Sequence, residues 1–155
     1  MTSSLNWLSS TSGSWTIPAS SGSLLSPKLA AELKKRSNIH IPAIGRVLFE
    51  EGDRPTSLYL VGKGEVSLAI RSRGRTVTCF RIGRDSVVGL STVVGRGLYP
   101  MTATASQDAE INAVNAETFL TLIENRPEFY FNVLQILAGE TLSAYTVLAA
   151  ITSKQ

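Results

Sequence analysis

Apolar and polar residues alternate over much of the segment 39–115, and this period-two pattern constrains the fold more than any other feature. The alternation is clearest over residues 65–71, where Val66, Leu68 and Ile70 are separated by small or polar residues. Turn-forming residues interrupt the segment at regular intervals, at Gly45, Gly52-Asp53, Lys63-Gly64, Arg73-Gly74 and Gly83-Arg84. Many short strands so spaced predict antiparallel sheet that closes into a sandwich, a barrel or a jelly roll.

Helices are predicted on both sides of this β segment. Ser26 and Pro27 are typical of an N-cap and a first helical position, and apolar residues then recur at helical spacing until residue 38. Asn115 can cap a second helix, and Pro127 separates that helix from a third. The apolar positions of the first two helices are Leu29, Ala30 and Leu33, then Phe119, Leu120, Leu122 and Ile123.

The last predicted helix, over residues 129–153, is apolar around most of its circumference, and Glu140 is its one charged residue. Such a helix must be covered on more than one side. We expect the protein's own sheet to cover one side and a twin helix from a second subunit to cover the other. A membrane span is the alternative, which Asn132, Gln135 and Glu140 disfavour. The residues predicted for the dimer interface are Leu134, Leu142, Tyr145 and Leu148.

Composition indicates one globular unit. The chain has 155 residues, of which 43% are hydrophobic and 17% charged, and its net charge of +3 is too small for a polybasic nucleic-acid surface. Residues 1–25 are rich in serine, carry no charge and lack a secretory signal, so we expect a flexible tail. Trp7 and Trp15 leave open whether this tail docks or stays solvated. The single Cys79 excludes an internal disulfide and favours a packed thiol in a cytoplasmic protein.

The segment VGLSTVVGRGLYPMTATA, residues 88–105, has the layout of a phosphate-binding cassette without charged anchors. Gly89 opens a short turn or helix, a loop with Gly95 and Gly97 follows, and Pro100 precedes a strand of small residues. A loop of this kind presents backbone N–H groups to an anion.

In this order of elements the sequence resembles a cyclic nucleotide-binding domain of the catabolite activator (Crp/Fnr-like) family. The best matches are RVLFEEGDRPTSLYLVGKGEVSL, residues 46–68, and the cassette that starts at Gly89. The resemblance implies an α+β, mainly β fold: a double-stranded β-helix, a jelly-roll-like β-roll, flanked by helices and ending in a long helix that forms the dimer seam. We therefore expect a tail over 1–25, a domain over 26–153 and no DNA-binding domain.

The cassette departs from the family's pattern at its two charged positions. In the family, a Glu after the first Gly takes the ribose hydroxyl and an Arg after the Pro pairs with the cyclic phosphate; Leu90 and Met101 stand there here. Arginine gives phosphate a charge-assisted contact that methionine cannot give. Arg96 could swing in as a substitute cation, or could be a solvated loop tip. The ligand-binding residues predicted on this basis are Gly89, Leu90, Ser91, Arg96, Met101, Thr102 and Ala103.

Three functions stay open: a sensor that still binds a cyclic nucleotide, a sensor that accepts a less polar small ligand, and a ligand-free dimerisation or interaction module. Loss of both charged anchors disfavours ordinary cyclic nucleotide binding. We therefore expect a regulatory ligand-sensing domain like those of transcription regulators, with non-standard or lost cyclic nucleotide binding. One histidine, His40, and one cysteine leave little basis for catalysis. We expect no catalytic residue, metal or cofactor, and a homodimer without direct contact to DNA or membrane.

Overall fold

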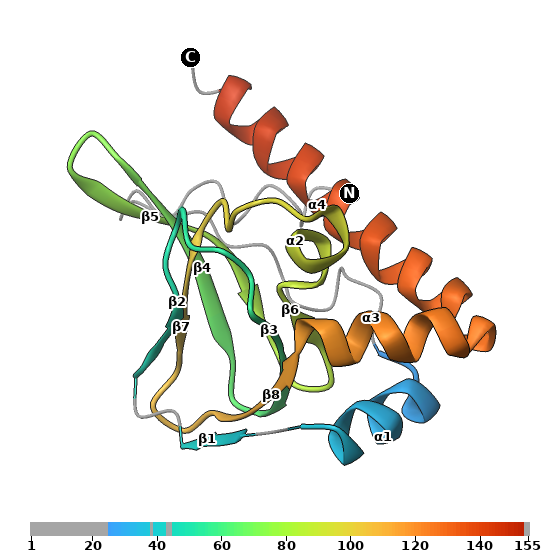
Figure 1. Cartoon of the computed structure of the whole chain (residues 1–155). Coiled ribbons are helices and arrows are strands. Elements are labelled where there is room, and N and C mark those ends of the chain that lie inside the picture. Colours follow the sequence, from blue (N-terminus) through green and yellow to red (C-terminus); the bar gives the residue numbers. More distant parts are fainter. Residues whose placement is uncertain (1–24, 38, 43–44, 154–155) are drawn as a thin grey trace.

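The computed structural model describes residues 25–153, apart from residue 38 and residues 43–44. Trp7, Trp15 and nearly all of the predicted tail therefore lie outside the described residues. Figure 1 shows a roll of β-strands with helices gathered along one side of it, the longest of them at the end of the chain.

The strands form two antiparallel sheets of four strands each, in the orders β1-β8-β3-β6 and β2-β7-β4-β5. The first sheet is made of β1 (Ile39–Pro42), β8 (Glu110–Asn115), β3 (Ser57–Lys63) and β6 (Val87–Val88). The second is made of β2 (Val47–Phe49), β7 (Thr102–Ala105), β4 (Val66–Ser72) and β5 (Arg75–Ile82). Most neighbouring strands are distant in sequence, as in the registers Leu58 with Val114 and Leu68 with Ala103. This arrangement confirms the predicted jelly-roll-like β-roll.

The predicted turns explain how the chain reverses between these strands. Gly64 has a φ of +74°, and a Cβ atom there would lie 2.7 Å from the Cα atom of Ala109, so glycine alone fits this turn. The turn predicted at Gly83-Arg84 lies one residue later, because Asp85 takes the left-handed conformation with a φ of 67°.

The helices begin at the predicted caps. The Leu29 N–H donates to Ser26 Oγ at 3.3 Å, which starts α1 (Pro27–Lys35). The N–H groups of Glu117 and Thr118 donate to Asn115 Oδ1 at 2.9 and 3.2 Å, which starts α3 (Ala116–Asn125). The short α2 (Leu90–Gly95) follows β6. A 3-10 turn, η3 (Pro127–Phe129), precedes the long α4 (Tyr130–Ser153) because Pro127 cannot continue α3.

The first sheet is buried on both faces, which divides the core in two. Along β3, Leu58 and Leu60 pack with the helices, whereas Tyr59 and Val61 point into the roll, since successive strand residues face opposite sides. The helical side of the core contains Leu29, Leu33, Phe119, Leu122, Val133 and Ile136, and the inside of the roll contains Phe49, Val66, Val88, Tyr99, Ala103 and Ile111. The residues that surround the interior of the roll are therefore held in place by a packed core on either side of the first sheet.

Candidate ligand-binding site

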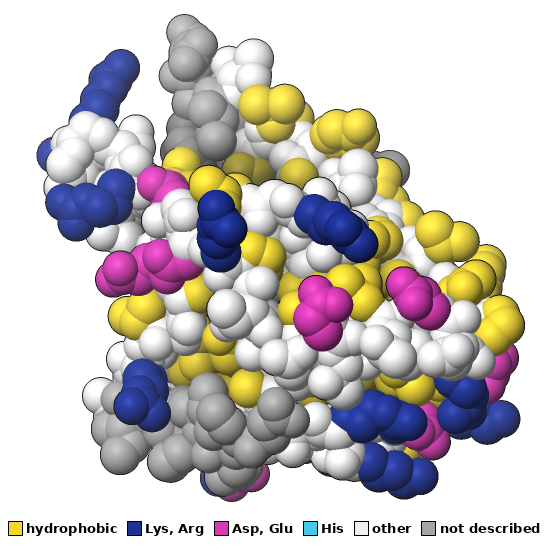
Figure 2. Space-filling view, in the orientation of Figure 1, with side chains coloured by type: hydrophobic (Ala, Val, Ile, Leu, Met, Phe, Trp, Pro, Cys, Tyr) yellow, Lys and Arg dark blue, Asp and Glu magenta, His cyan; other side chains and the backbone are white. Residues whose placement is uncertain are grey.

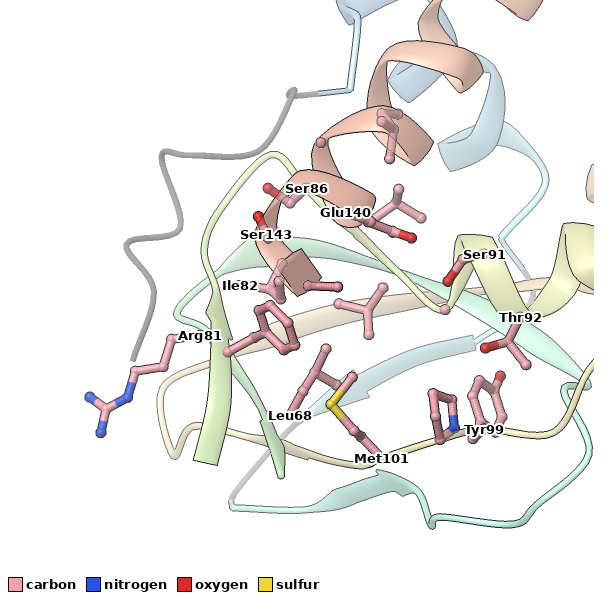
Figure 3. Close-up of a pocket in the computed structure, with 18 of the residues that line it drawn as sticks. Leu68, Arg81, Ile82, Ser86, Ser91, Thr92, Tyr99, Met101, Glu140 and Ser143 are labelled. Atoms are coloured by element: carbon pink, nitrogen blue, oxygen red, sulfur yellow. The ribbon is translucent and has the colours of Figure 1, made fainter. Parts of the chain in front are cut away.

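A cavity of about 270 Å³ lies where the roll, the segment leading into α2 and the helix α4 meet (Figure 3). Its walls are mostly apolar and come from β2, β4, β5 and α4, with the segments 86–92 and 99–101 between them. The apolar or aromatic lining side chains are Phe49, Leu68, Phe80, Ile82, Val87, Val88, Tyr99, Pro100, Met101, Ile136 and Ala144. A partly open hollow with mostly apolar walls and a few polar groups is typical of small-molecule sites.

Local packing around Tyr99 fixes one wall of this cavity. The Tyr99 hydroxyl donates to the carbonyl oxygen of Ser57 at 2.7 Å, and its ring stacks on Phe49 at 3.6 Å between centroids. Burial is the main reason why the pKa of Tyr99 is raised, so this phenol stays neutral. Gly89 takes a φ of +93° beside the ring, which lets the chain turn from β6 into α2.

Three of the seven predicted ligand-binding residues, Gly89, Ser91 and Met101, line this cavity. They come from the two ends of the cassette, which the fold brings together across the hollow. Met101 stands where the family pattern has arginine, and Figure 3 shows its thioether near Leu68, so this wall is apolar.

The other four predicted residues lie elsewhere. Leu90 is 1% exposed and packs in the core on the helical side, because α2 begins at this residue and turns its first side chain inward. Ala103 is fully buried inside the roll. Thr102 Oγ1 accepts a hydrogen bond from the Glu51 N–H at 3.0 Å. Arg96 ends α2 with a φ of 56° and borders a separate hollow. In this structure none of these four lines the cavity.

Positive charge is turned away from the cavity. Arg81 is the one cation among the residues that line it, and Figure 3 shows its side chain extending outward. Its Nη1 atom lies 3.8 Å from Glu65 Oε1, and about half of the side chain is exposed. A phosphate in the cavity would therefore lose its hydration without gaining a cationic partner from these residues.

Glu140 brings a carboxylate to the cavity from α4, and sequence analysis assigned it no role. Burial raises the pKa of Glu140, and a hydrogen bond with the Ser91 side chain lowers it by a smaller amount. Figure 3 shows the carboxylate directed toward the start of α2, where Ser91 lies. The signal that could have identified it is its position as the single charge of an apolar helix.

Thr92 is a second polar residue that sequence analysis missed. It is 8% exposed and lines the cavity. Its hydroxyl makes no hydrogen bond to any residue that the structure describes. Buried hydroxyls are normally satisfied, so this group is a candidate partner for a bound molecule.

In the described part of the chain, neither the cysteine nor the acidic residues are arranged for nucleophilic or metal chemistry. Cys79 is 4% exposed, and burial raises the pKa of its thiol, which disfavours the reactive thiolate. Within the described ranges, no group of three or more His, Cys, Asp or Glu residues is placed to hold a metal ion.

The outer face of α4 is the second candidate functional surface. The four residues predicted for a dimer interface are exposed, with exposed fractions of 61% for Leu134, 65% for Leu142, 64% for Tyr145 and 60% for Leu148. Hydrophobic side chains follow the edge of the molecule over α4 (Figure 2). By length and composition alone, residues 127–150 could also cross a membrane, a test that core helices of soluble proteins pass as well.

Comparisons with known proteins agree with this architecture. The sequence pattern of the family described as "Cyclic nucleotide-binding domain" matches residues 43–126. The cyclic AMP receptor protein of Thermus thermophilus is 30% identical over 95 residues, which cover 61% of this chain and 44% of that protein. This chain thus spans less than half of that relative.

Two solved structures have a similar fold. The catabolite activator protein of Thermus thermophilus has a TM-score of 0.68 and 26% identity, with 83% of this chain and 61% of that chain covered. The N-terminal domain of a transcriptional regulator from Streptomyces coelicolor A3(2) has a TM-score of 0.60 and 26% identity, with coverage of 78% and 85%.

Proposed function

Because the chain belongs to the cyclic nucleotide-binding domain family, we propose that it is a regulatory ligand-sensing domain with non-standard cyclic nucleotide binding. One observation carries this proposal: the cavity is walled by α4, the same helix that presents an exposed apolar face on its other side. A molecule in the cavity would touch Ile136 and Glu140, so its binding free energy can bias the position of α4.

The non-standard part of the proposal rests on the charges that face the cavity. Met101 offers no cation to a phosphate, and Arg81 points outward. A charge-assisted hydrogen bond contributes about 1.5–3 kcal/mol, so loss of the anchoring arginine alone weakens a nucleotide by about tenfold or more. The carboxylate of Glu140 adds repulsion when it is ionised.

The output in this proposal is a homodimer formed through α4. Leu134, Leu142, Tyr145 and Leu148 fall within about 120° of arc at 3.6 residues per turn, so they form one stripe along the helix. A stripe of large exposed apolar side chains is typical of a subunit interface. The proposal includes a cytoplasmic, non-enzymatic role without direct contact to DNA or membrane by these residues.

A ligand-free dimerisation module is the second candidate function. Two observations favour it: among the described lining residues no cation faces the interior of the cavity, and the outer face of α4 is apolar. Both suit a domain that has kept its interface and lost its ligand. The two functions differ in whether a small molecule binds in the cavity and biases the position of α4.

Two measurements on the full chain test the proposal. Light scattering is expected to give a dimer for the wild type and a monomer for Leu148→Asp, while Gln135→Asp, on the flank of the stripe, keeps the dimer. Calorimetry with cyclic AMP and cyclic GMP is expected to show no micromolar binding, because the arginine anchor is missing. Micromolar nucleotide binding would contradict the non-standard site, and a dimer that survives Leu148→Asp would contradict the interface.

A further inference from the structure

The polar groups of the cavity are arranged for a ligand that donates hydrogen bonds. Glu140 presents carboxylate oxygens from α4, and Ser91 and Thr92 present hydroxyls from α2 on the facing wall. The remaining walls are mostly apolar or aromatic, with Phe49, Leu68 and Tyr99 among them, and they also include the hydroxyls of Ser86 and Ser143. A carboxylate accepts hydrogen bonds only, and the hydroxyls can accept them too.

The charge inside the cavity has one sign. Among the described lining residues the ionisable groups are Glu140, Arg81 and Tyr99. Arg81 extends outward near Glu65, and the Tyr99 phenol is neutral and hydrogen-bonded to Ser57. Glu140 is therefore the one group that brings charge to the interior, and that charge is negative. An anion would be repelled, whereas a cation would pair with a half-buried carboxylate whose one partner among the described residues is the Ser91 side chain.

The size of the hollow limits the ligand further. A dry cavity of roughly 150 Å³ admits a benzene ring, so a cavity of about 270 Å³ admits two fused rings with a short side chain. The stacked pair of Tyr99 and Phe49 on one wall gives a flat ring an aromatic partner.

Building on the proposed sensing function, we propose that this cavity binds a compact aromatic amine whose ammonium group pairs with Glu140. The apolar walls bury the ring, and the unpartnered hydroxyl of Thr92 accepts a ring N–H. The ligand class is thus cationic and mainly apolar, in contrast to a cyclic nucleotide. An ammonium beside the carboxylate favours the ionised form of Glu140 and so opposes the effect of burial, which raises the pKa of this group.

Three probes that share one ring system and differ in charge test this inference: tryptamine, 3-methylindole and indole-3-propionate. Calorimetry on the full chain at pH 7.5 is expected to show tryptamine binding about tenfold more tightly than 3-methylindole, because a charge-assisted pair is added. Indole-3-propionate is expected to bind at least tenfold more weakly than 3-methylindole. In Glu140→Gln, tryptamine falls to the affinity of 3-methylindole, which itself does not change. Glu124→Gln, an exposed change on α3, is the matched control and leaves all three affinities as they are.

The outcomes separate this inference from the proposed function. Equal or tighter binding of indole-3-propionate, or a tryptamine preference that persists in Glu140→Gln, overturns the amine assignment. If cyclic AMP or cyclic GMP binds at micromolar concentration while tryptamine does not bind, the ligand class is wrong and the sensing function stands. If neither the three probes nor the two nucleotides bind, both fail, and the ligand-free module is the remaining function. Glu140→Gln nearly preserves the shape of the side chain, and far-UV circular dichroism checks that it is folded.

Discussion

The inner and outer faces of α4 are built from the same kinds of residue, yet they have opposite surroundings. On the inner face, Val133 and Ile136 are 7% and 5% exposed, and Glu140 lines the cavity. On the outer face, Leu134 and Leu142 are 61% and 65% exposed. The charged residue of this helix thus points inward, and large apolar residues point outward.

This contrast shows that packing within one subunit does not account for the whole pattern of α4. A helix selected for packing alone buries its apolar stripe and exposes its charges. Here the inward carboxylate lowers stability unless a ligand pairs with it, and the outward leucines are covered only if a second chain binds. The proposed ligand and the proposed dimer would each account for one of these departures, one on each side of the same helix.

The largest predicted difference between the two faces is in how much an alanine substitution lowers the free energy of unfolding. Ile136→Ala is expected to lower the free energy of unfolding by about 2–4 kcal/mol, because it leaves a cavity in the core. Leu134→Ala is expected to change it by less than about 0.5 kcal/mol in the Leu148→Asp background, where no dimer covers it. Urea titration of Ile136→Ala and of Leu134→Ala, each in the Leu148→Asp background, measures the difference. Equal losses at the two positions would show that the outer face is buried within one subunit.

The next largest effect is expected for a substitution at the cavity, and it is a change in the affinity for a cyclic nucleotide. Met101→Arg restores a cation at the cavity and is expected to tighten cyclic AMP binding by about tenfold. Adding Glu140→Gln should tighten it further, because a repulsive carboxylate is removed. Met101→Leu keeps the apolar wall and is the control for calorimetry. A Met101→Arg protein that gains nothing would mean that residue 101 does not face the phosphate position.

A smaller effect is expected from dimer formation through the outer face: the melting temperature should depend on protein concentration. The melting temperature of the wild type is expected to rise by about 2–4 °C for each tenfold increase in protein concentration, because mass action stabilises a dimer. Leu148→Asp should melt at one temperature at all concentrations. Scanning calorimetry over a hundredfold range checks this, and a wild type without concentration dependence would mean that α4 does not form the dimer.

Features with a local cause could be predicted from the sequence. Gly64 forms a turn in which its own φ is +74°, and Ser26 and Asn115 cap helices with their own side chains, so each could be read from a few neighbouring residues. The alternation of Val66, Leu68 and Ile70 similarly predicted a strand, which the structure has as part of β4.

Side-chain directions in the site could not be predicted in the same way. Leu90 turned out to lie in the core because α2 begins at that residue, and a shift of one position at a helix start changes which side chain points inward. Glu140 was visible as a lone charge, but a helix that is apolar almost all round gives no pattern to say which face such a charge takes. The direction of both side chains depends on tertiary packing.

The smallest effect concerns Glu140 and pH. Burial raises the pKa of this carboxyl in the folded protein above its ordinary value of 4.5. Below pH 4.5 the group is protonated in both the folded and unfolded chain, so it costs nothing. As pH rises, the unfolded chain releases the proton first, and the wild type loses stability until the folded pKa is passed. Glu140→Gln has no such loss, so the two proteins should melt together near pH 4.

At pH 8 Glu140→Gln should melt higher than the wild type, because the wild type has by then lost the stability that the raised pKa of Glu140 removes. Addition of tryptamine should abolish this difference, because an ammonium beside Glu140 stabilises the ionised form in the wild type alone. A wild type that is the more stable protein at pH 8 without any ligand would show that Glu140 already has a cationic partner. The inner face of α4 would then be a structural ion pair, and its contrast with the outer face would no longer indicate a ligand.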